Sequence, residues 1–375
     1  MDDKLSVERQ ELNAEIKLSV IIPVYNACEY LGQALDSVIS QTLDGIEIIC
    51  IDDGSTDCSL KIVQEYQQKD SRIRIVTETN AGPGLARNNG LKRARGEYVI
   101  FLDADDFFEP ILLEGLYERA KRDDLDIVIA NYDIYNCKTS QFLANTESVY
   151  SGIYEGGAIT SKNEYPDCIL QSTTGSAWNK LFRRTFLLEK NISFLENVKM
   201  FEDVYFTVTA IAFAERVGSI PGILIHHRVY SEQTRAKMYK KYYTQVPEVY
   251  FRIKEFMMRG GMYEPLYKGF INLSVSRCYH IYNLLNADAK AGFWNMLHEE
   301  YAELLDWQDR SKDFFEQEAL CDFCANVQMY NHKQYEKRVE KGLKLSLSHV
   351  EGLVKKNKFF RRLRAFFHIK RKDEM

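Results

Sequence analysis

Short apolar runs alternate with longer segments of helical periodicity through the first third of the chain. Five of these runs are rich in Ile and Val and apolar on both faces, as buried parallel strands are. They occupy residues 18–26, 46–53, 73–78, 97–103 and 126–133. Between them, apolar positions recur at helical spacing, and no hairpin signal separates one strand from the next. The pattern predicts an α/β fold with a doubly wound, mostly parallel sheet.

The pattern changes after about residue 134. Residues 135–175 are polar and irregular, and residues 176–190 are typical of a turn that leads into a helix. One more short strand is expected within residues 217–231. From about residue 233 to 350 the chain is helical in periodicity, rich in Tyr and poor in strand signals. We therefore expect an added C-terminal helical region.

Polar residues gather where the predicted strands end. The first strand runs into Pro23 and Tyr25, and the second into Asp53 within "DDGS". The third leads to a loop that contains Arg87, and the fourth ends in "DADD" at residues 103–106. Taken singly, "DDGS" is also compatible with a turn and a helix cap, and "DADD" with a solvated loop that opens a helix. Because ligands bind outside the carboxyl ends of strands in an open parallel sheet, their common edge favours a ligand site.

The acids of "DADD" indicate a bound cation, because carboxylates this close repel one another unless a positive charge lies between them. Asp103 and Asp105 flank one small residue, so both can point to one ion, and oxygen ligands suit Mg2+ or Mn2+. Such an ion would bridge the carboxylates to a diphosphate. Tyr25 can stack on a base, and Asp53 can accept a hydrogen bond from a base N–H, which favours a pyrimidine imide such as uracil.

At these residues the sequence resembles the family 2 glycosyltransferases, inverting enzymes of the GT-A fold that use nucleotide-sugar donors, including those of bacterial surface-polysaccharide synthesis. The matching pieces are "SVIIPVYNACEYLGQALDSVISQT", "DDGSTD", "GPGLARNNGL", "GEYVIFLDADD", "AWNKLFRR" and "FEDVYF". They follow the family order from about residue 17 to 230, a little over half of the chain, and as a set they are highly specific. The region after residue 233 shows no motif of the family.

The resemblance implies a division of the chain by role. The expected parts are an N-terminal extension (1–16), a GT-A catalytic domain (17–232) with a nucleotide-binding half (17–134) and an acceptor half (135–232), a helical C-terminal region (233–350) and a basic amphipathic tail (351–375). The expected activity is transfer of a hexosyl or N-acetylhexosaminyl group from a nucleotide-sugar, a UDP-sugar by the base chemistry above.

The resemblance also implies a donor site at the strand ends. It assigns Pro23, Tyr25 and Asp53 to the base, Asp103 to the ribose side and to the metal, Arg87 to the ribose and phosphates, and Asp105 to a Mn2+ or Mg2+ ion as its main ligand.

On the acceptor side, "FEDVYF" supplies Glu202 and Asp203, and the family pattern makes the aspartate the catalytic base. An acid that caps or salt-bridges a helix start is the alternative for Asp203. Trp178, Asn179 and Lys180 are expected near the donor sugar or the acceptor, a glycan or lipid-linked glycan. The base would deprotonate the acceptor hydroxyl as it attacks the anomeric carbon opposite the departing diphosphate, which inverts the configuration.

Charge and termini exclude several classes of protein. The formal net charge of −5 gives no reason to expect nucleic acid as a partner. Residues 1–17 lack the apolar core of a signal peptide, and no run is long and uncharged enough to span a membrane. We therefore expect a cytoplasmic protein.

The cysteines indicate a reducing compartment. Eight cysteines follow no disulfide framework, and Cys50 lies inside an apolar strand, so reduced thiols are expected. The pair in "CDFC", Cys321 and Cys324, is compatible with half of a zinc site. No second CxxC accompanies it and only His332 lies nearby in sequence, so two helix-face thiols are the expectation.

Residues 355–372 form a basic segment with nine Lys or Arg and no acid. Its large apolar side chains recur at i, i+1, i+4, i+7 and i+8, from Phe359 to Phe367, which is typical of a helix that lies on an anionic membrane surface. Docking on the protein's own acidic body is an alternative. RNA binding is a weaker one, because the aromatic residues share a face with Leu363 and do not alternate with the charges.

Three other functions fit the sequence less well. A nucleotidyltransferase places a Gly-rich phosphate loop after its first strand, where this chain has "PVYNACEYL". A dinucleotide-dependent dehydrogenase needs a third glycine where "GPGLARNNG" has Arg87, and needs the motif after the first strand. A non-catalytic nucleotide-sugar or glycan-binding module has no need of both the acids of "DADD" and the Glu202–Asp203 pair.

Overall fold

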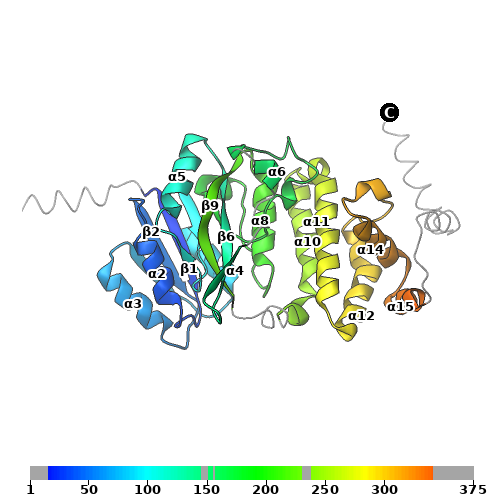
Figure 1. Cartoon of the computed structure of the whole chain (residues 1–375), viewed down its shortest axis with the longest axis horizontal. Coiled ribbons are helices and arrows are strands. Elements are labelled where there is room, and N and C mark those ends of the chain that lie inside the picture. Colours follow the sequence, from blue (N-terminus) through cyan, green and yellow to red (C-terminus); the bar gives the residue numbers. More distant parts are fainter. Residues whose placement is uncertain (1–15, 145–150, 155–156, 230–237, 341–375) are drawn as a thin grey trace, which may run out of the picture. The chain divides into compact units, whose positions relative to one another are not determined.

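The computed structural model describes residues 16–144, 151–154, 157–229 and 238–340. Within these ranges nine strands form one sheet in the order β3-β2-β1-β4-β8-β6-β9-β5, with β7 paired to β6 (Figure 1). This arrangement confirms the α/β class. The strands are β1 (Leu18–Val24), β2 (Ile46–Asp52), β3 (Ile73–Thr77), β4 (Tyr98–Phe101), β5 (Phe107–Phe108), β6 (Ile127–Asn136), β7 (Gln141–Ala144), β8 (Lys180–Arg183) and β9 (Val217–Val229).

The N-terminal half of the sheet is parallel, as its apolar runs predict. Strands β3, β2, β1 and β4 pair in parallel, and every residue of β2 and β4 is buried. The register places Val24 beside Asp52. The N–H of Leu102 donates to the carbonyl of Ile21 at 3.0 Å, so the chain beyond β4 stays alongside β1. Residues that follow β1, β2 and β4 therefore leave the sheet at one edge.

Strand β8 corrects the prediction for residues 176–190. The sequence predicts only a turn and a helix there, but Lys180–Arg183 pairs antiparallel with both β4 and β6. Four residues are too few to show the alternation that identifies a strand, and the first three of them are all buried. The expected helix follows directly as α7 (Arg184–Glu189).

Two more strands differ from the prediction. Part of the segment predicted to be irregular forms a hairpin, in which β6 runs to Asn136 and β7 returns antiparallel to it. Strand β9 has 13 residues, because it continues through Pro221 and Gly222, a pair that normally marks a turn. It pairs in parallel with β6, across register shifts around Asn131, and antiparallel with the short β5.

The helices and helical turns alternate with the strands in the first part of the chain and follow one another in the second. They are α2 (Leu31–Ile39), α3 (Ser59–Lys69), α4 (Pro83–Arg93), α5 (Leu112–Arg122), α6 (Ser151–Tyr154), η2 (Ile169–Gln171), α7, α8 (Glu202–Phe213), α10 (Gln245–Arg259), α11 (Tyr263–Leu284), α12 (Ala287–Met296), η3 (Leu297–Tyr301), α13 (Ala302–Leu304), η4 (Lys312–Phe314), α14 (Glu318–Met329) and α15 (His332–Glu340).

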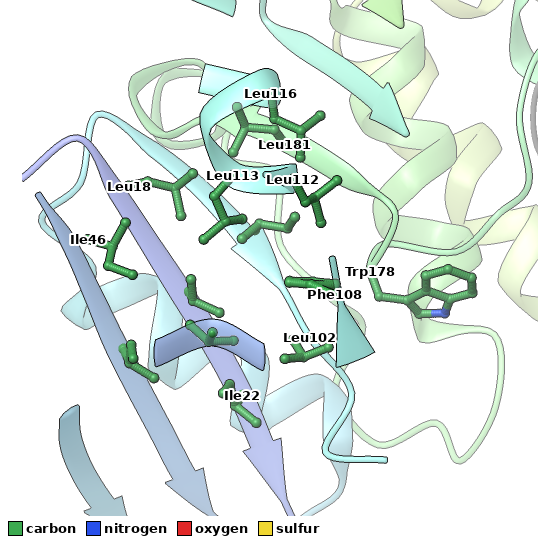
Figure 2. Close-up of a cluster of buried hydrophobic side chains, with 14 of the residues drawn as sticks. Leu18, Ile22, Ile46, Leu102, Phe108, Leu112, Leu113, Leu116, Trp178 and Leu181 are labelled. Atoms are coloured by element: carbon green, nitrogen blue, oxygen red, sulfur yellow. The ribbon is translucent and has the colours of Figure 1, made fainter. Parts of the chain in front are cut away.

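Helices α2, α3 and α5 cover one face of the sheet and enclose a hydrophobic core with it. Figure 2 shows Leu18 and Ile22 of β1 within this core, together with Leu112 and Leu116 of α5. All four side chains are fully buried, and each contributes about 1.5–3 kcal/mol of transfer free energy. Trp178 lies at the end of the same cluster (Figure 2).

Helices α4 and α8 pack on the opposite face. A Cβ on Gly90 of α4 would come within 2.3 Å of the Cγ2 of Ile21 in β1, so this close approach requires glycine. Phe101 of β4 packs edge-on against Phe194 and against Phe206 of α8, with ring centroids 4.9 and 5.4 Å apart. The sheet is thus covered on both faces, as predicted.

The chain divides into two compact units, Met1–Leu273 and Ser274–Met375. Helix α10 belongs to the first unit, where it packs on α8, and α11 crosses the division. The described part of the second unit is helical, as predicted, around the fully buried Trp294 and Trp307. Cys321 and Cys324 are free, buried thiols on α14. Among the described residues, no helix has the length and apolar character needed to cross a membrane.

Candidate active site

The ends of β1 and β2 place the residues predicted to hold a base at one edge of the sheet. Pro23 lies within β1, and Tyr25 follows it with 51% of its surface exposed. Asp53 follows β2, and its N–H donates to the carbonyl of Val24 at 2.9 Å. An exposed aromatic ring thus lies in the loop beside a buried carboxylate, which is an arrangement that can stack on a base and bind its edge.

The carboxylate of Asp53 also shapes the loop that leads into α4. Its two oxygens accept the N–H groups of Ala81 and Gly82 at 2.8 and 2.9 Å. Each oxygen has a second lone pair, so these bonds leave capacity for a ligand N–H. Because Gly82 is the residue before α4, Asp53 fixes where that helix begins.

A disulfide bond joins the loops after β1 and β2, which corrects the prediction that the cysteines are reduced. Cys28 and Cys58 are bonded, and the other six cysteines are free thiols. The same loops are linked by Asp57, which accepts the N–H of Cys28 at 3.2 Å, and by Asn26, which accepts the N–H of Thr56 at 2.8 Å. The spacing of 30 residues gives no sign of this pairing, which follows from the parallel register of β1 and β2.

Arg87 joins the end of β4 to the start of α8. Its Nη2 donates to Asp103 Oδ1 at 2.7 Å, and its Nη1 donates to Glu202 Oε1 at 2.8 Å. Burial alone would lower the pKa of the guanidinium, but the carboxylates of Asp103 and Glu202 outweigh this effect and raise it. Phe194 lies under the guanidinium, 5.3 Å from ring centroid to Cζ. Arg87 therefore brings together Asp103 and Glu202, which the sequence predicted from separate motifs.

Strand β9 holds the acids of the loop after β4. Asp106 is almost fully buried and accepts hydrogen bonds from His227 Nδ1 at 2.9 Å and from the N–H of Arg228 at 2.7 Å. Burial raises the pKa of Asp106, and His227 opposes this shift. Arg228 also donates through Nε to the carbonyl of Asp105 at 2.6 Å. Asp103 and Asp105, by contrast, remain partly exposed.

The partly exposed acids of the loop after β4 fit a divalent ion that takes most of its ligands from a bound substrate. No group of three or more His, Cys, Asp or Glu is placed to hold a metal in the part of the chain that the structure describes. Mg2+ and Mn2+ sites in phosphate-transfer enzymes need only one or two carboxylates, because phosphate oxygens and water complete the shell. Asp105 and Asp103 can supply these carboxylates, whereas Asp106 is already committed to β9.

Glu202 and Asp203 begin helix α8 at a strained backbone position. Phe201, the residue before the helix, has φ 70°, a left-handed conformation that costs a bulky residue about 1–3 kcal/mol. Two hydrogen bonds support the segment, since Gln245 Oε1 accepts the N–H groups of Lys199 and Met200 at 3.1 and 3.2 Å. Such strain is typical of segments that position functional groups.

The pKa of Asp203 is raised towards neutral pH. Burial, with the neighbouring Glu202 carboxylate, raises the pKa of Asp203 to about 7, while Arg87 acts in the opposite direction. Oδ1 of Asp203 accepts the N–H of Val204 at 2.8 Å. The position of Asp203 in the first turn of α8 is compatible both with an acid that stabilises the helix start and with a base.

Trp178, Asn179 and Lys180 are all buried, with 6%, 0% and 0% of their surfaces exposed. Trp178 stacks on His227 with ring centroids 4.7 Å apart. Asn179 Nδ2 donates to the carbonyl of Ala130 at 3.1 Å. Lys180 Nζ donates to the backbone carbonyls of Thr174 and Ser176 and to Asn179 Oδ1, so its polar atom is satisfied within the protein.

Sequence reasoning missed the contribution of β9 and α10. His227 and Arg228 are more than 120 residues from the acid that they hold, and only the pairing of β9 with β5 brings them together. His226, the neighbouring residue, bridges Asp133 and Glu109 at 2.7 and 2.9 Å. The run "HHR" within a strand was the available signal.

Comparisons with known proteins identify the family of the chain. The model of the family described as "Glycosyl transferase family 2" matches residues 19–188. The putative glycosyltransferase EpsH of Bacillus subtilis is 32% identical over 270 residues, which are 70% of this chain and 76% of the relative. The chain belongs to glycosyltransferase family 2. The resemblance seen in the motifs is thus confirmed, and the protein is a glycosyltransferase.

Two further comparisons cover less of the chain or show a lower sequence identity. The poly(ribitol-phosphate) beta-glucosyltransferase of Bacillus spizizenii is 32% identical over 209 residues, 54% of this chain and 30% of the relative. TarS (residues 1–349) of S. aureus, solved in complex with UDP-GlcNAc, has a TM-score of 0.67 at 22% identity, over 87% of this chain and 92% of TarS. The TarS structure confirms the GT-A fold.

Proposed function

We propose that this family 2 glycosyltransferase moves a sugar from a UDP-sugar to a hydroxyl of a glycan or lipid-linked glycan, with inversion at the anomeric carbon. The observation that carries the proposal is the bridge made by Arg87. It holds the end of β4, where the donor diphosphate would bind, against Glu202, the neighbour of Asp203. A donor site and a base on opposite sides of one sugar are the requirement of a single displacement.

The donor is proposed from the nucleotide end of the site. Tyr25 is exposed for stacking, and Asp53 is buried beside it with acceptor capacity for an imide N–H. TarS, which shares the fold, is known in complex with UDP and with UDP-GlcNAc. Asp103 would lie on the ribose side, and Arg87 near the ribose and the phosphates.

A Mn2+ or Mg2+ ion is proposed at Asp105, with Asp103 as the second ligand. When bound, the ion neutralises the charge that develops on the departing diphosphate. Asp105 is the main ligand in this proposal, as the resemblance implies, and Asp103, which also accepts from Arg87, is the second. Arg228 and His227 would keep the acids in place by holding the loop from β9.

Asp203 is proposed to take the proton from the acceptor hydroxyl as that oxygen attacks the anomeric carbon. With a pKa raised to about 7, this carboxylate is a stronger base than an ordinary aspartate and is still largely ionised above neutral pH. Glu202 remains paired with Arg87 and keeps the start of α8 in position. One displacement, with no covalent intermediate, inverts the configuration.

Replacing Asp203 with asparagine tests the proposed mechanism. Turnover should fall by about 10^2 to 10^4, the usual contribution of a general base, while binding of the UDP-sugar survives. The measurement is metal-dependent hydrolysis and transfer with a panel of UDP-sugars, and UDP binding by calorimetry. Asp44→Asn, on an exposed aspartate before β2, is the matched control. Near-normal turnover in the Asp203 variant would remove Asp203 from this role.

An anionic membrane surface is proposed as a further partner through residues 355–372. These residues lie outside the described part of the chain, so the proposal rests on nine basic residues and the apolar stripe from Phe359 to Phe367. Such a contact would bring the enzyme to a lipid-linked acceptor on the inner face of the cell membrane. Deletion of residues 355–375 should abolish binding to phosphatidylglycerol vesicles, and persistent binding would contradict the proposal.

A further inference from the structure

Lys180 is a fully buried lysine whose hydrogen bonds all go to one turn. Its Nζ donates to the carbonyls of Thr174 and Ser176 at 2.9 and 2.7 Å, and to Asn179 Oδ1 at 2.6 Å. Three acceptors match the three N–H groups of an ammonium, and none of them can donate in return. The ammonium therefore fixes the backbone on both sides of Gly175.

Gly175 lies directly against the helix that carries the proposed base. A Cβ on Gly175 would come within 2.8 Å of Val204 Cγ2 and 3.4 Å of Val204 Cα. Valine is branched at Cβ and holds one rotamer in a helix, so it cannot turn away from this contact. The turn at residues 174–176 thus packs against Val204 and fixes its position.

Val204 in turn holds the carboxylate of Asp203. Its N–H donates to Asp203 Oδ1 at 2.8 Å. From these contacts we infer that Lys180 is a positioning residue. It fixes the turn at 174–176, this turn fixes Val204 by packing, and Val204 in turn holds the Asp203 carboxylate. The inference rests on the proposed role of Asp203 and differs from the contact with sugar that the resemblance implied for Lys180.

Two carboxylates and two basic side chains from the neighbouring elements interact electrostatically with Asp203. Glu202 lies beside it on α8, Arg87 reaches it from α4, Asp103 from the end of β4, and Lys180 from β8. The Nζ of Lys180 donates to oxygens of Thr174, Ser176 and Asn179, so its effect on Asp203 is carried by packing as well as by charge.

Gly175→Ala tests the packing step without removing any charge. The added methyl group must displace Val204, so kcat for UDP-sugar hydrolysis should fall by at least about tenfold, since small misplacements at a reacting centre cost up to ~100-fold. KM for the donor should stay within about twofold, because the donor residues are untouched. Gly115→Ala on α5, where the nearest atom to the new Cβ is 4.0 Å away, is the matched control.

Val204→Ala supplies the rescue. It removes the Cγ2 atom that the new methyl group meets, so the Gly175→Ala/Val204→Ala variant should recover to within about threefold of Val204→Ala alone. A merely structural role for the turn would not confine the effect of Gly175→Ala to kcat. Lys180→Met, which removes all three N–H donors, should show the same split between kcat and KM if it folds.

Asp203→Asn, measured in parallel, separates the outcomes. If it turns over normally, or if the wild type hydrolyses no UDP-sugar, the proposed function fails and the inference fails with it. If Asp203→Asn is impaired but Gly175→Ala keeps a normal kcat, the inference alone is wrong. An impaired Gly175→Ala with no recovery in the double variant would also overturn it.

Discussion

Replacing Arg87 with methionine should both destabilise the protein and abolish turnover. Methionine keeps much of the length and apolar character of the arginine stem but removes the guanidinium. Two carboxylates, Asp103 and Glu202, would then face each other without the cation that now lies 2.7 and 2.8 Å from them. The expected effect is therefore larger than the loss of two surface ion pairs.

The burial of the three groups sets the magnitude. The side chains of Arg87 and Glu202 are 8% and 9% exposed, and that of Asp103 is 26% exposed. Breaking a buried pair by removing one partner costs about 3–5 kcal/mol, and water can solvate Asp103 in part, so about 3 kcal/mol is expected. For a unit of this size the melting temperature should fall by roughly 6–12 °C.

Thermal and urea unfolding of the full chain, followed by circular dichroism, measure this effect. Arg93→Met is the matched control, because Arg93 lies on the exposed side of the same helix. Adding Glu202→Gln to Arg87→Met should restore part of the stability, since it removes one of the two uncompensated charges. The reasoning is refuted if Arg87→Met melts with Arg93→Met, or if the added Glu202→Gln lowers stability further.

Three further predictions concern pH, metal and redox state. Turnover should rise with pH through about 7 as Asp203 ionises. The pKa of Asp203 is raised from 3.8 to about 7 in the folded protein, so the free energy of unfolding should fall as the pH rises over that interval. Asp203→Asn should therefore be more stable than the wild type at pH 8, by at most about 4 kcal/mol, but not at pH 4. Asp105→Asn should weaken UDP-sugar binding in the presence of Mn2+, and an unchanged titration would argue against the metal site. The free energy of unfolding of Cys28→Ser/Cys58→Ser should be about 3–4 kcal/mol lower than that of the wild type, as expected for a closed loop of 30 residues. In urea unfolding, a reductant should destabilise the oxidised wild type but have no effect on this variant.

The parallel half of the sheet could be predicted because its strands are apolar on both faces. Strand β8 could not, because four residues, three of them buried, carry no periodicity, and the prediction for β9 was too short because of Pro221 and Gly222. Both errors have one cause: local composition is a weak guide where tertiary pairing decides the structure. The helical character of residues after 238 was clear from periodicity alone, but not its division at Leu273.

The candidate site was predictable where strand ends define it and unpredictable where distant segments meet. Asp53 and Asp103 follow β2 and β4, the two parallel strands that flank β1, so their common edge follows from the sheet. The bridge from Arg87 to Glu202 spans 115 residues, and no spacing rule reveals it. The disulfide between Cys28 and Cys58 was missed for the same reason, since compartment and spacing were considered but not the approach of two loops.

Strand β8 determines where a chimeric enzyme can be joined. A fragment that ends at residue 134 would keep β4 and β6 but lose the strand that lies between them. Both would then present unpaired backbone groups, which promote edge-to-edge association of chains. A chimera of two members of the family should therefore place its crossover after α8, beyond Phe213, so that β4, β8 and β6 all come from one parent.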